Sequence, residues 1–386
     1  MSGTTHITSA SFAYPAVDST TRARLARASA SFQPDGSSFV LNTCLRTEVV
    51  VAGDAAVLAE RFSAMFGDDA DLGAAKIRTD QDAVEHLYRV AAGLESPVRG
   101  EREILTQFRQ TLATASERGD VSGIFAKLLE TAVAVARQAR ELLPESPHDS
   151  MAAVAAQVVG NADRIAVLGS GAMASAVVDA LLGLPAPPDV TVVARTPDRV
   201  TNPAVSVWHF DRALEAVEHF PALISATSAK RRLVESGPME EAIGRRSTPL
   251  TLIDMAMPPD FSLSSSSLLT YLDIDDLARM AERRPRHDGA DDMVRTAAAE
   301  AYRAFVDHHQ VGPVIGGLTR RADSVVDEVV QRFGGRLSDT EDLAVLRQTA
   351  HTVARTLLAG PISYLKDPER AAEAVDVVAD AFGVDE

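Results

Sequence analysis

A single cysteine, Cys44, lies two residues before an arginine in the segment Leu41-Asn-Thr-Cys-Leu-Arg-Thr-Glu. Apolar runs on both sides indicate two short strands, so we expect the cysteine on a turn or strand end, where a side chain can be presented to a cleft. A thiolate is the reactive form, and free cysteine titrates at about 8.5, so activation needs a nearby cation. Arg46 could supply that cation, or could bind a substrate carboxylate through its planar fork. An inert, buried cysteine is the alternative to both interpretations.

A second chemical signal is a glycine-rich turn between an apolar strand at 164–168 and a helix that runs to about Leu182. The turn consists of Gly169, Ser170, Gly171, Ala172, Met173 and Ala174, in the pattern G-x-G-x-x-A. The first glycine allows a tight turn, the second lets the backbone approach a pyrophosphate, and the alanine packs helix against strand. Free N–H groups at the positive end of the helix would bind the diphosphate. We therefore predict a dinucleotide site.

The strand that follows indicates which dinucleotide is bound. An NAD site usually ends this strand with an acidic residue that holds the ribose 2′-hydroxyl. Here the strand ends at Arg195 and Thr196, and the first acid is Asp198. These side chains suit a 2′-phosphate, so we predict NADPH. The alternative is that Arg195 is only a solvated loop residue.

Composition limits the class of protein. The 386 residues suggest two or three domains, and 46% hydrophobic with 24% charged residues is typical of a globular protein. A net charge of −16 argues against a general nucleic-acid coat, although a local basic patch is compatible with it. With one cysteine, no signal-peptide pattern and no apolar run of roughly 18 residues, we expect a cytoplasmic protein without a membrane span.

The order of apolar patterns suggests three parts. Short strands and helices fill the first part, which we place at 1–146 and end at the polar break that begins with Pro144. Strands alternating with helices in 147–274 indicate a parallel, doubly wound sheet. The remainder, 275–386, is helical, with a long helix expected from Asp292 to His309 and an interruption near Pro313.

Several segments resemble one enzyme family. The segment around Cys44 resembles the S-T-C-N-R-T-E motif of glutamyl-tRNA reductase. The segment that begins at His86, H-L-Y-R-V-A-A-G-L-E-S-P-V-R-G-E-R-E-I-L-T-Q, is similar to that family's H-L-x-R-V-A-x-G-L-D-S-x-V-x-G-E-x-Q-I-L-x-Q. Three shorter matches begin at Ile253, Tyr271 and Val311. Five matches in order are more specific than one motif, so the chain is identified as a divergent member of the family.

The resemblance implies a multidomain α/β fold. An N-terminal α+β catalytic domain would be followed by a Rossmann-type NADP-binding domain, a long linking helix and a C-terminal helical dimerisation domain. The family reduces glutamate esterified to its tRNA to glutamate-1-semialdehyde, the first step of tetrapyrrole synthesis from glutamate. We therefore expect glutamyl-tRNA(Glu) as substrate, NADPH as cofactor, no metal ion, a homodimer, and the downstream aminomutase as a candidate partner.

Carried over residue by residue, the resemblance assigns roles to side chains. Cys44 would attack the ester carbonyl to form a thioester, and His86 would assist proton transfer or polarise the carbonyl. Arg46 would bind the carboxylate of the glutamyl group. The other substrate-binding candidates are Thr43, Ser96, Glu101, Arg102, Glu103 and Gln107. For Glu101 and Gln107, a solvated helix face is the alternative.

The chain departs from the family pattern at several positions. Leu45 replaces the asparagine after the cysteine, Glu103 replaces a glutamine, and the family's N-terminal motif is not recognisable. These changes keep two alternatives open. One is a paralogue that reduces another acyl ester or thioester or serves specialised metabolism, and the other is a non-catalytic NADP-binding regulator.

A tRNA substrate requires basic surface on an acidic protein. The candidate side chains are Arg99, Arg102, Arg109, Arg137, Arg140, Arg245, Arg246, Arg283, Arg284 and Arg286. Each of them could equally belong to a solvated face.

Overall fold

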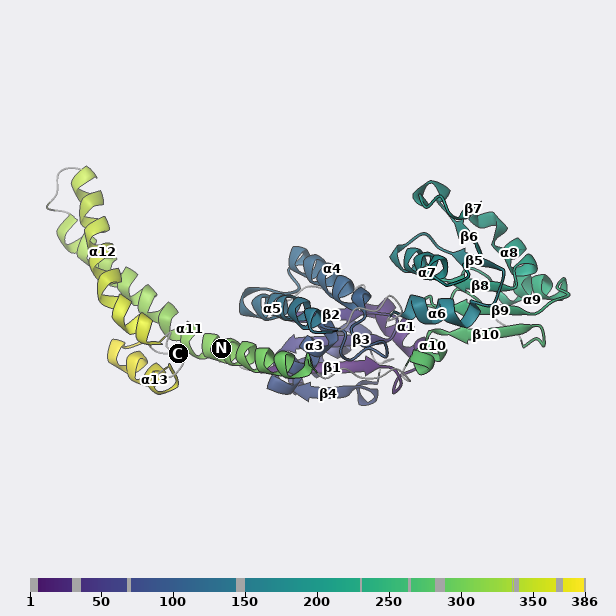
Figure 1. Cartoon of the computed structure of the whole chain (residues 1–386). Coiled ribbons are helices and arrows are strands. Elements are labelled where there is room, and N and C mark those ends of the chain that lie inside the picture. The colour runs from purple at the N-terminus through teal and green to yellow at the C-terminus, as the bar shows by residue number, and fades with distance from the viewer. Residues whose placement is uncertain are drawn as a thin grey trace.

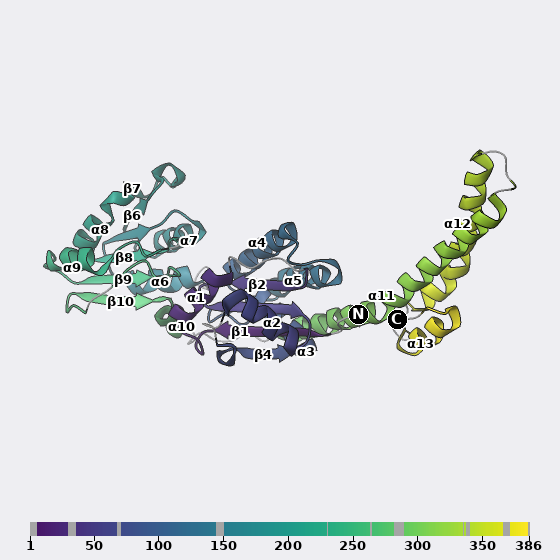
Figure 2. The ribbon, with the colours of Figure 1, turned by 180° about the vertical axis from the view of Figure 1, so that it is seen from behind.

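The computed structural model describes residues 6–29, 36–67, 71–143, 150–229, 231–262, 265–281, 289–334, 336, 340–365 and 371–384. The molecule is elongated and has three parts (Figures 1 and 2). An N-terminal domain (β1 to α5) lies between a parallel-sheet domain (α6 to α10) and a helical arm (α11 to α13). The predicted boundary after residue 146 falls among residues outside this description, and the one after residue 274 falls at the start of α10.

The N-terminal domain is built on an antiparallel sheet in the order β2-β3-β1-β4. Its strands are β1 (Ile7–Ala13), β2 (Ser38–Asn42), β3 (Arg46–Ala52) and β4 (Lys76–Thr79). Its helices are α1 (Ser19–Ser29), α2 (Ala55–Phe66), α3 (Asp80–Ala91), α4 (Arg102–Arg118) and α5 (Gly123–Glu141), with the short η2 (Leu72–Ala74). One face of the sheet packs against α1 and α2, and the other against α3, α4 and α5.

Strand β3 divides its side chains between these two faces because successive residues of a strand point in opposite directions. Val49 and Val51 pack into the α1–α2 cluster, whereas Val50 packs into the cluster that contains α3. Arg46 and Glu48 share the parity of Val50. The strand therefore directs two charged side chains towards α3.

The second domain contains a six-stranded parallel sheet in the order β10-β9-β8-β5-β6-β7. The strands are β5 (Arg164–Leu168), β6 (Asp189–Ala194), β7 (Ser206–His209), β8 (Ala222–Ser225), β9 (Leu250–Asp254) and β10 (Leu269–Asp273). The helices are α6 (Met151–Val159), α7 (Ala172–Leu182), α8 (Ala213–His219), α9 (Ser236–Gly244) and α10 (Ile274–Ala281), with η3 (Pro197–Arg199) and η4 (Phe210–Arg212). Helices α6, α7 and α10 cover one face, and α8 and α9 the other. The strand order reverses between β5 and β8, and doubly wound sheets bind ligands in a crevice at the carboxyl ends of the strands at such a reversal, so we expect the ligand crevice of this domain there.

The arm consists of α11 (Asp291–Gly334), α12 (Thr340–Leu365) and α13 (Ala371–Phe382). The predicted interruption near Pro313 is wrong, because α11 continues through Pro313. A proline inside a helix removes one backbone hydrogen bond and favours a bend, but it does not have to end the helix when side-chain packing continues. Val311, Val314 and Leu318 pack against α12 and α13 on both sides of the proline, and α11 changes direction along its length (Figures 1 and 2).

Candidate active site

Cys44 lies on the tight turn that joins β2 to β3, as the sequence predicts. The backbone N–H of Thr43 donates to the carbonyl of Arg46 at 2.9 Å, and the Thr43 hydroxyl accepts from the N–H of Leu45 at 3.3 Å. These bonds fix the three residues between the strands. The residue as a whole has intermediate exposure, although its thiol lies in a largely desolvated environment.

The turn packs against the parallel-sheet domain. Leu45 and Val98 are buried in one hydrophobic cluster with Met151 of α6 and Ile274 of α10, and Cys44 packs on the edge of this cluster. The candidate nucleophile therefore lies between the N-terminal and parallel-sheet domains.

The surroundings of the thiol favour its protonated form. Burial and the negative charge of Glu101 raise the pKa of Cys44 to about 12, against the opposing effects of Arg22 and, more weakly, Arg46. The expectation that Arg46 activates the thiol does not hold in this state, because desolvation outweighs the nearby cations. A nucleophilic role for Cys44 therefore requires a group that accepts its proton.

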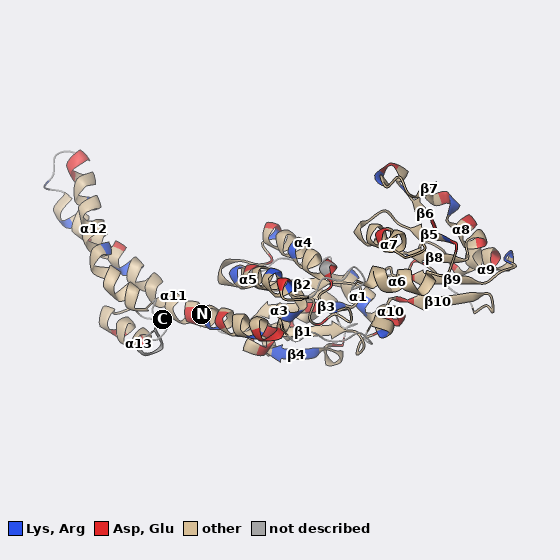
Figure 3. Ribbon diagram, viewed as in Figure 1, with Lys and Arg blue, Asp and Glu red and all other residues tan. Residues whose placement is uncertain are grey.

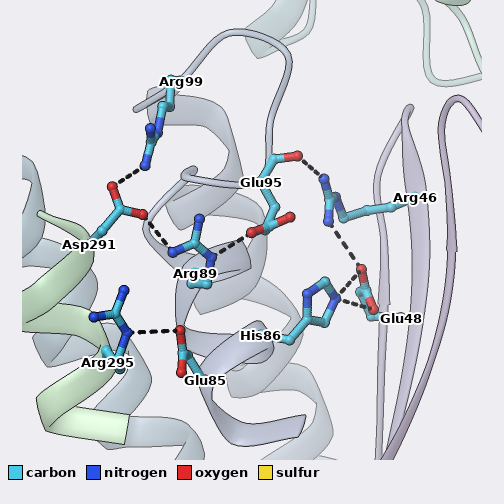
Figure 4. Close-up of polar contacts among 9 residues, drawn as sticks. All are labelled: Arg46, Glu48, Glu85, His86, Arg89, Glu95, Arg99, Asp291 and Arg295. Carbon is cyan, nitrogen blue, oxygen red and sulfur yellow. Dashed lines mark hydrogen bonds and ion pairs between the residues drawn. The ribbon is translucent and has the colours of Figure 1, made fainter. Parts of the chain in front are cut away.

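Arg46 and His86 are brought together by Glu48 (Figure 4). Glu48 is fully buried, and its carboxylate accepts from Arg46 Nη1 at 3.1 Å and lies 3.1–3.2 Å from His86 Nε2. Ser11, opposite Glu48 on β1, donates to the same carboxylate at 2.9 Å. These partners outweigh the effect of burial and lower the pKa of Glu48.

A chain of ion pairs extends this cluster to the long helix (Figure 4). Arg46 donates to the carbonyl of Glu95, whose carboxylate accepts from Arg89 at 2.5 Å. Arg89 and Arg99 both contact Asp291, the first residue of α11. Sequence reasoning missed Glu48 and Glu95. The alternation of β3 could have placed Glu48 beside Arg46, but nothing local in the sequence predicts the contact with Glu95.

The remaining substrate-binding candidates cluster at the start of α4. Ser96 donates to the carboxylate of buried Glu101 at 2.8 Å, and the backbone N–H of Met151 also donates to this carboxylate. Burial and the charge of Glu103 raise the pKa of Glu101 to about 7. One oxygen of Glu103 and one of Gln107 are buried without a hydrogen-bond partner within the described part of the chain. These side chains are therefore not on a fully solvated face. The side chain of Arg102 lies outside the description.

The glycine turn has the form that a dinucleotide requires. Gly169 has a φ of +119°, and a Cβ there would lie 2.8 Å from the carbonyl oxygen of Ala226, so the turn itself demands glycine. A Cβ on Gly171 would have no heavy atom within 4 Å, which leaves open space beside the first turn of α7. No side chain caps that helix start. Its N–H groups are thus suited to a phosphate, and the residues present fit a dinucleotide.

Two buried carboxylates fix the loop at the same edge of the sheet. Asp254, at the end of β9, accepts from the backbone N–H groups of Ala256, Asp260 and Phe261. Asp260 accepts from the hydroxyls of Ser225 and Thr227. Burial and the charge of Asp260 raise the pKa of Asp254 to about 7. At the opposite side of the crevice, Arg195 and Thr196 follow β6 and are exposed, so they are free to contact a ligand.

Models of protein families match almost all of the chain. Residues 9–142 match "Glutamyl-tRNAGlu reductase, N-terminal domain", and residues 290–384 match "Glutamyl-tRNAGlu reductase, dimerisation domain". Glutamyl-tRNA reductase of Priestia megaterium is 30% identical over 383 residues, which cover 90% of this chain and 85% of that protein. The chain belongs to the glutamyl-tRNA reductase family.

Other matches describe the parts of this family member. Residues 153–280 match "Shikimate / quinate 5-dehydrogenase", which supports an oxidoreductase with a nicotinamide cofactor in the parallel-sheet domain. The match at 290–384 supports a homodimer. Glutamyl-tRNA reductase of Bacillus subtilis is 29% identical over 368 residues, covering 87% of this chain and 79% of that protein. The structure of the Methanopyrus kandleri enzyme aligns over 100% of both chains with 22% identity and a TM-score of 0.44.

The arginines considered for RNA binding have different environments. Arg246 is buried and donates to the carbonyls of Val217, Thr248 and Pro249, so it is structural and the expectation of an RNA contact is wrong. Arg99 is held by Asp291, and Arg245 pairs with Glu218 and Glu241. Arg109 and Arg137 are exposed on α4 and α5.

The other arginines in this set are described only in part. Arg140, on α5, is partly exposed. The expected cluster Arg283, Arg284 and Arg286 lies outside the described residues. Acidic and basic residues are interspersed along the described part of the chain (Figure 3). None of the described helices is both long enough and apolar enough to cross a bilayer.

The two glycines of the turn predict different mutant phenotypes. Gly169→Ala forces a side chain into left-handed backbone against the Ala226 carbonyl and should destabilise the domain by roughly 1–3 kcal/mol. Gly171→Ala places its methyl group in open space and should leave the melting temperature unchanged while weakening the binding of a nicotinamide dinucleotide at least tenfold. Thermal unfolding and titration of both variants with NADH and NADPH test this. Parent-like affinity for both dinucleotides in Gly171→Ala would show that the phosphates bind elsewhere.

Proposed function

We propose that this chain is an NADPH-dependent glutamyl-tRNA reductase that releases glutamate-1-semialdehyde through a thioester on Cys44. The observation that carries the proposal is the position of the cysteine turn. Cys44, a residue of intermediate exposure, is packed against the parallel-sheet domain, whose carboxyl edge bears a glycine turn suited to a dinucleotide. Relatives named glutamyl-tRNA reductase over 82–85% of their own length support the substrate.

Acyl capture uses residues of the N-terminal domain. The Cys44 sulfur attacks the ester carbonyl, a C–S bond forms, and the ester C–O bond breaks as the ribose hydroxyl of the tRNA leaves with a proton. Because the thiol is protonated at rest, it must first lose its proton. Glu101 is suited to accept it, because its pKa is raised to about 7 and its charge acts on the thiol.

Arg46 and His86 position the substrate in this proposal. Two of the five N–H groups of the buried Arg46 bind Glu48 and the Glu95 carbonyl, and we assign the others to the glutamyl carboxylate. His86 is oriented by Glu48, which leaves its other ring nitrogen for the substrate carbonyl or the leaving group. Thr43, Ser96 and Gln107 complete the proposed pocket.

The cofactor would be held by the turn Gly169–Ala174, with Arg195 and Thr196 at the 2′-phosphate. When bound, the reduced nicotinamide supplies the hydride that converts the acyl group to an aldehyde. The chain itself holds the acyl group on Cys44, excludes water from it through the buried contacts of Leu45 and Val98, and recovers the thiol when the C–S bond breaks.

The homodimer would bury apolar side chains of the arm. Val353, Leu357 and Val377 are 53%, 71% and 67% exposed on α12 and α13, more than expected for helices without a partner. An interaction with the downstream aminomutase and a cytoplasmic location stay predictions from the sequence.

Replacement of the nucleophile tests the proposed reaction. With glutamyl-tRNA and no cofactor, the parent protein should gain the mass of a glutamyl group, and Cys44→Ser should not. Semialdehyde release by Cys44→Ser should fall at least 1,000-fold, because a hydroxyl ionises far less readily than a thiol. Turnover equal to that of the parent would remove the thioester mechanism. A protein that binds NADPH and tRNA without forming an adduct would be the regulator instead.

The pKa of Glu101 predicts a pH dependence for acyl capture. The rate of adduct formation should rise with pH through about 7, where Glu101 loses its proton, and Glu101→Gln should lower it about 100-fold and remove this rise. Glu103→Gln is the matched control, because loss of its charge should shift the midpoint to lower pH without removing the base. An unchanged midpoint in Glu101→Gln would assign the proton transfer to another group.

Stability measurements separate this role from a structural one. The pKa of Glu101 is raised above its ordinary value of 4.5, so the folded state keeps a proton that the unfolded state loses between pH 4.5 and about 7. Stability from this group therefore falls as pH rises through that window, and Glu101→Gln should remove the fall. At pH 8 the Glu101→Gln substitution should therefore stabilise the folded protein, whereas it should slow acyl capture.

The proposed NADP preference depends on Arg195. Arg195→Ala removes an exposed cation at the end of β6 and should weaken NADPH binding about tenfold or more while leaving NADH binding within twofold. Arg199, exposed one turn further along, provides the control, because Arg199→Ala should change neither affinity by more than twofold. Tighter binding of NADH than of NADPH by the parent protein would contradict the assignment.

A further inference from the structure

Arg22 is a fully buried side chain that connects the cysteine turn to the parallel-sheet domain. It lies in the first turns of α1, and its Nε donates to the carbonyl oxygen of Cys44 at 3.2 Å. One terminal nitrogen donates to the carbonyl of Val17, and the other binds the carboxylate of Asp275. Of the cations that act on the thiol, Arg22 has the largest effect on the pKa of Cys44. One guanidinium therefore holds the backbone of the nucleophile and a carboxylate of the other domain.

Asp275 is itself held in place at the carboxyl end of β10. It is the second residue of α10, and its backbone N–H, like that of Asp276, donates to the carboxylate of Asp273 at 2.9–3.0 Å. Its side chain is mostly buried, so the ion pair with Arg22 is shielded from solvent. The cysteine turn is thus tied to the end of a strand and not to a flexible loop.

That strand end lies on the side of the crevice opposite the proposed 2′-phosphate site. All strands of the sheet are parallel, so the ends of β10 and β5 share one edge, and three strand spacings separate them by about 14 Å. Arg195 follows β6, on the other side of β5. A dinucleotide that spans the crevice with its adenosine towards β6 directs its other half towards β8, β9 and β10. The Arg22–Asp275 pair therefore anchors Cys44 on the side where the reacting end of the cofactor belongs.

We propose that Arg22, through Asp275, is a positioning residue that sets the acylated Cys44 for reduction. The inference rests on the proposed function. Acyl capture uses Cys44, Arg46, His86 and Glu101, all in the N-terminal domain, so it does not require Asp275. In reduction, the carbonyl carbon accepts a hydride from NADPH, the C–S bond breaks, and the thiolate takes a proton, which requires correct placement across both domains. A displacement of ~1 Å in such a geometry can cost about 100-fold in rate.

The test separates the two steps in Asp275→Asn. Intact-mass measurement of the glutamyl adduct without cofactor gives the rate of capture, semialdehyde release after addition of NADPH to the acylated protein gives the rate of reduction, and titration gives NADPH affinity. We expect capture and NADPH affinity within twofold of the parent and reduction at least 30-fold slower. Asp276→Asn is the matched control. It removes the charge that pairs with Arg279 on the same helical turn and keeps an amide oxygen that can accept from the backbone N–H of Asp273, so all three quantities should stay within threefold.

Each outcome decides between the proposals. A parent protein that never forms the adduct would overturn the proposed function and this inference with it. A parent that is acylated and reduced, with Asp275→Asn reduced at the same rate, would overturn only the inference. Equal slowing of capture and reduction would show a merely structural role for the pair. If Asp275→Asn does not fold, Asp275→Glu takes its place. The longer side chain keeps the charge but displaces the cysteine turn, so reduction should slow severalfold while the rate of capture is unchanged. Parent-like rates of both steps would overturn the inference.

Discussion

The proposed reaction requires the thiol of one domain to face a ligand of another, and the contact between the Cys44 turn and the parallel-sheet domain meets this constraint. Two kinds of interaction make the contact. Leu45 and Val98 join the hydrophobic cluster that includes α6 and α10, and burying a leucine contributes about 1.5–3 kcal/mol. Arg22 and Asp275 add a shielded ion pair, whose attraction is largely offset by the cost of removing both charges from water. The apolar packing therefore supplies most of the stability of this contact, and the ion pair fixes the orientation of the cysteine turn.

The same burial that positions the thiol also keeps it protonated, so the site needs carboxylates with different properties. Glu48 and Glu101 are both buried, yet the pKa of Glu48 is lowered and that of Glu101 is raised. The difference follows from their partners. Glu48 contacts both Arg46 and His86, whereas Glu101 has a hydroxyl, a backbone N–H and, more weakly, the charge of Arg46 to offset burial and the charge of Glu103. One carboxylate is thereby suited to hold its neighbours and the other to exchange a proton near neutral pH.

Local patterns in the sequence predict the cysteine turn and the glycine turn, but they do not predict the residues that join the cysteine turn to the parallel-sheet domain. The turn at Cys44 is predicted because it lies between two short apolar strands, and the turn at Gly169 because it lies between a short apolar strand and a helix. Arg22 and Asp275 are 253 residues apart, and no periodicity or motif relates them. The continuation of α11 through Pro313 was missed for a similar reason. It depends on contacts with α12 and α13, which a single-helix pattern cannot contain.

The positions of Leu45 and Glu103 in the structure explain what these departures from the family pattern change. Leu45, where the family has asparagine, does not line an open pocket; it is buried against α6 and α10, so the change exchanges a polar contact for apolar packing between the domains. Glu103, where the family has glutamine, adds a charge that raises the pKa of Glu101. A glutamine would leave that carboxylate more acidic and a weaker base. The first change thus acts on the placement of the thiol, and the second on the group proposed to deprotonate it. The thiol, Arg46, His86 and the glycine turn are retained. This pattern is expected when the chemistry is kept and its surroundings are altered.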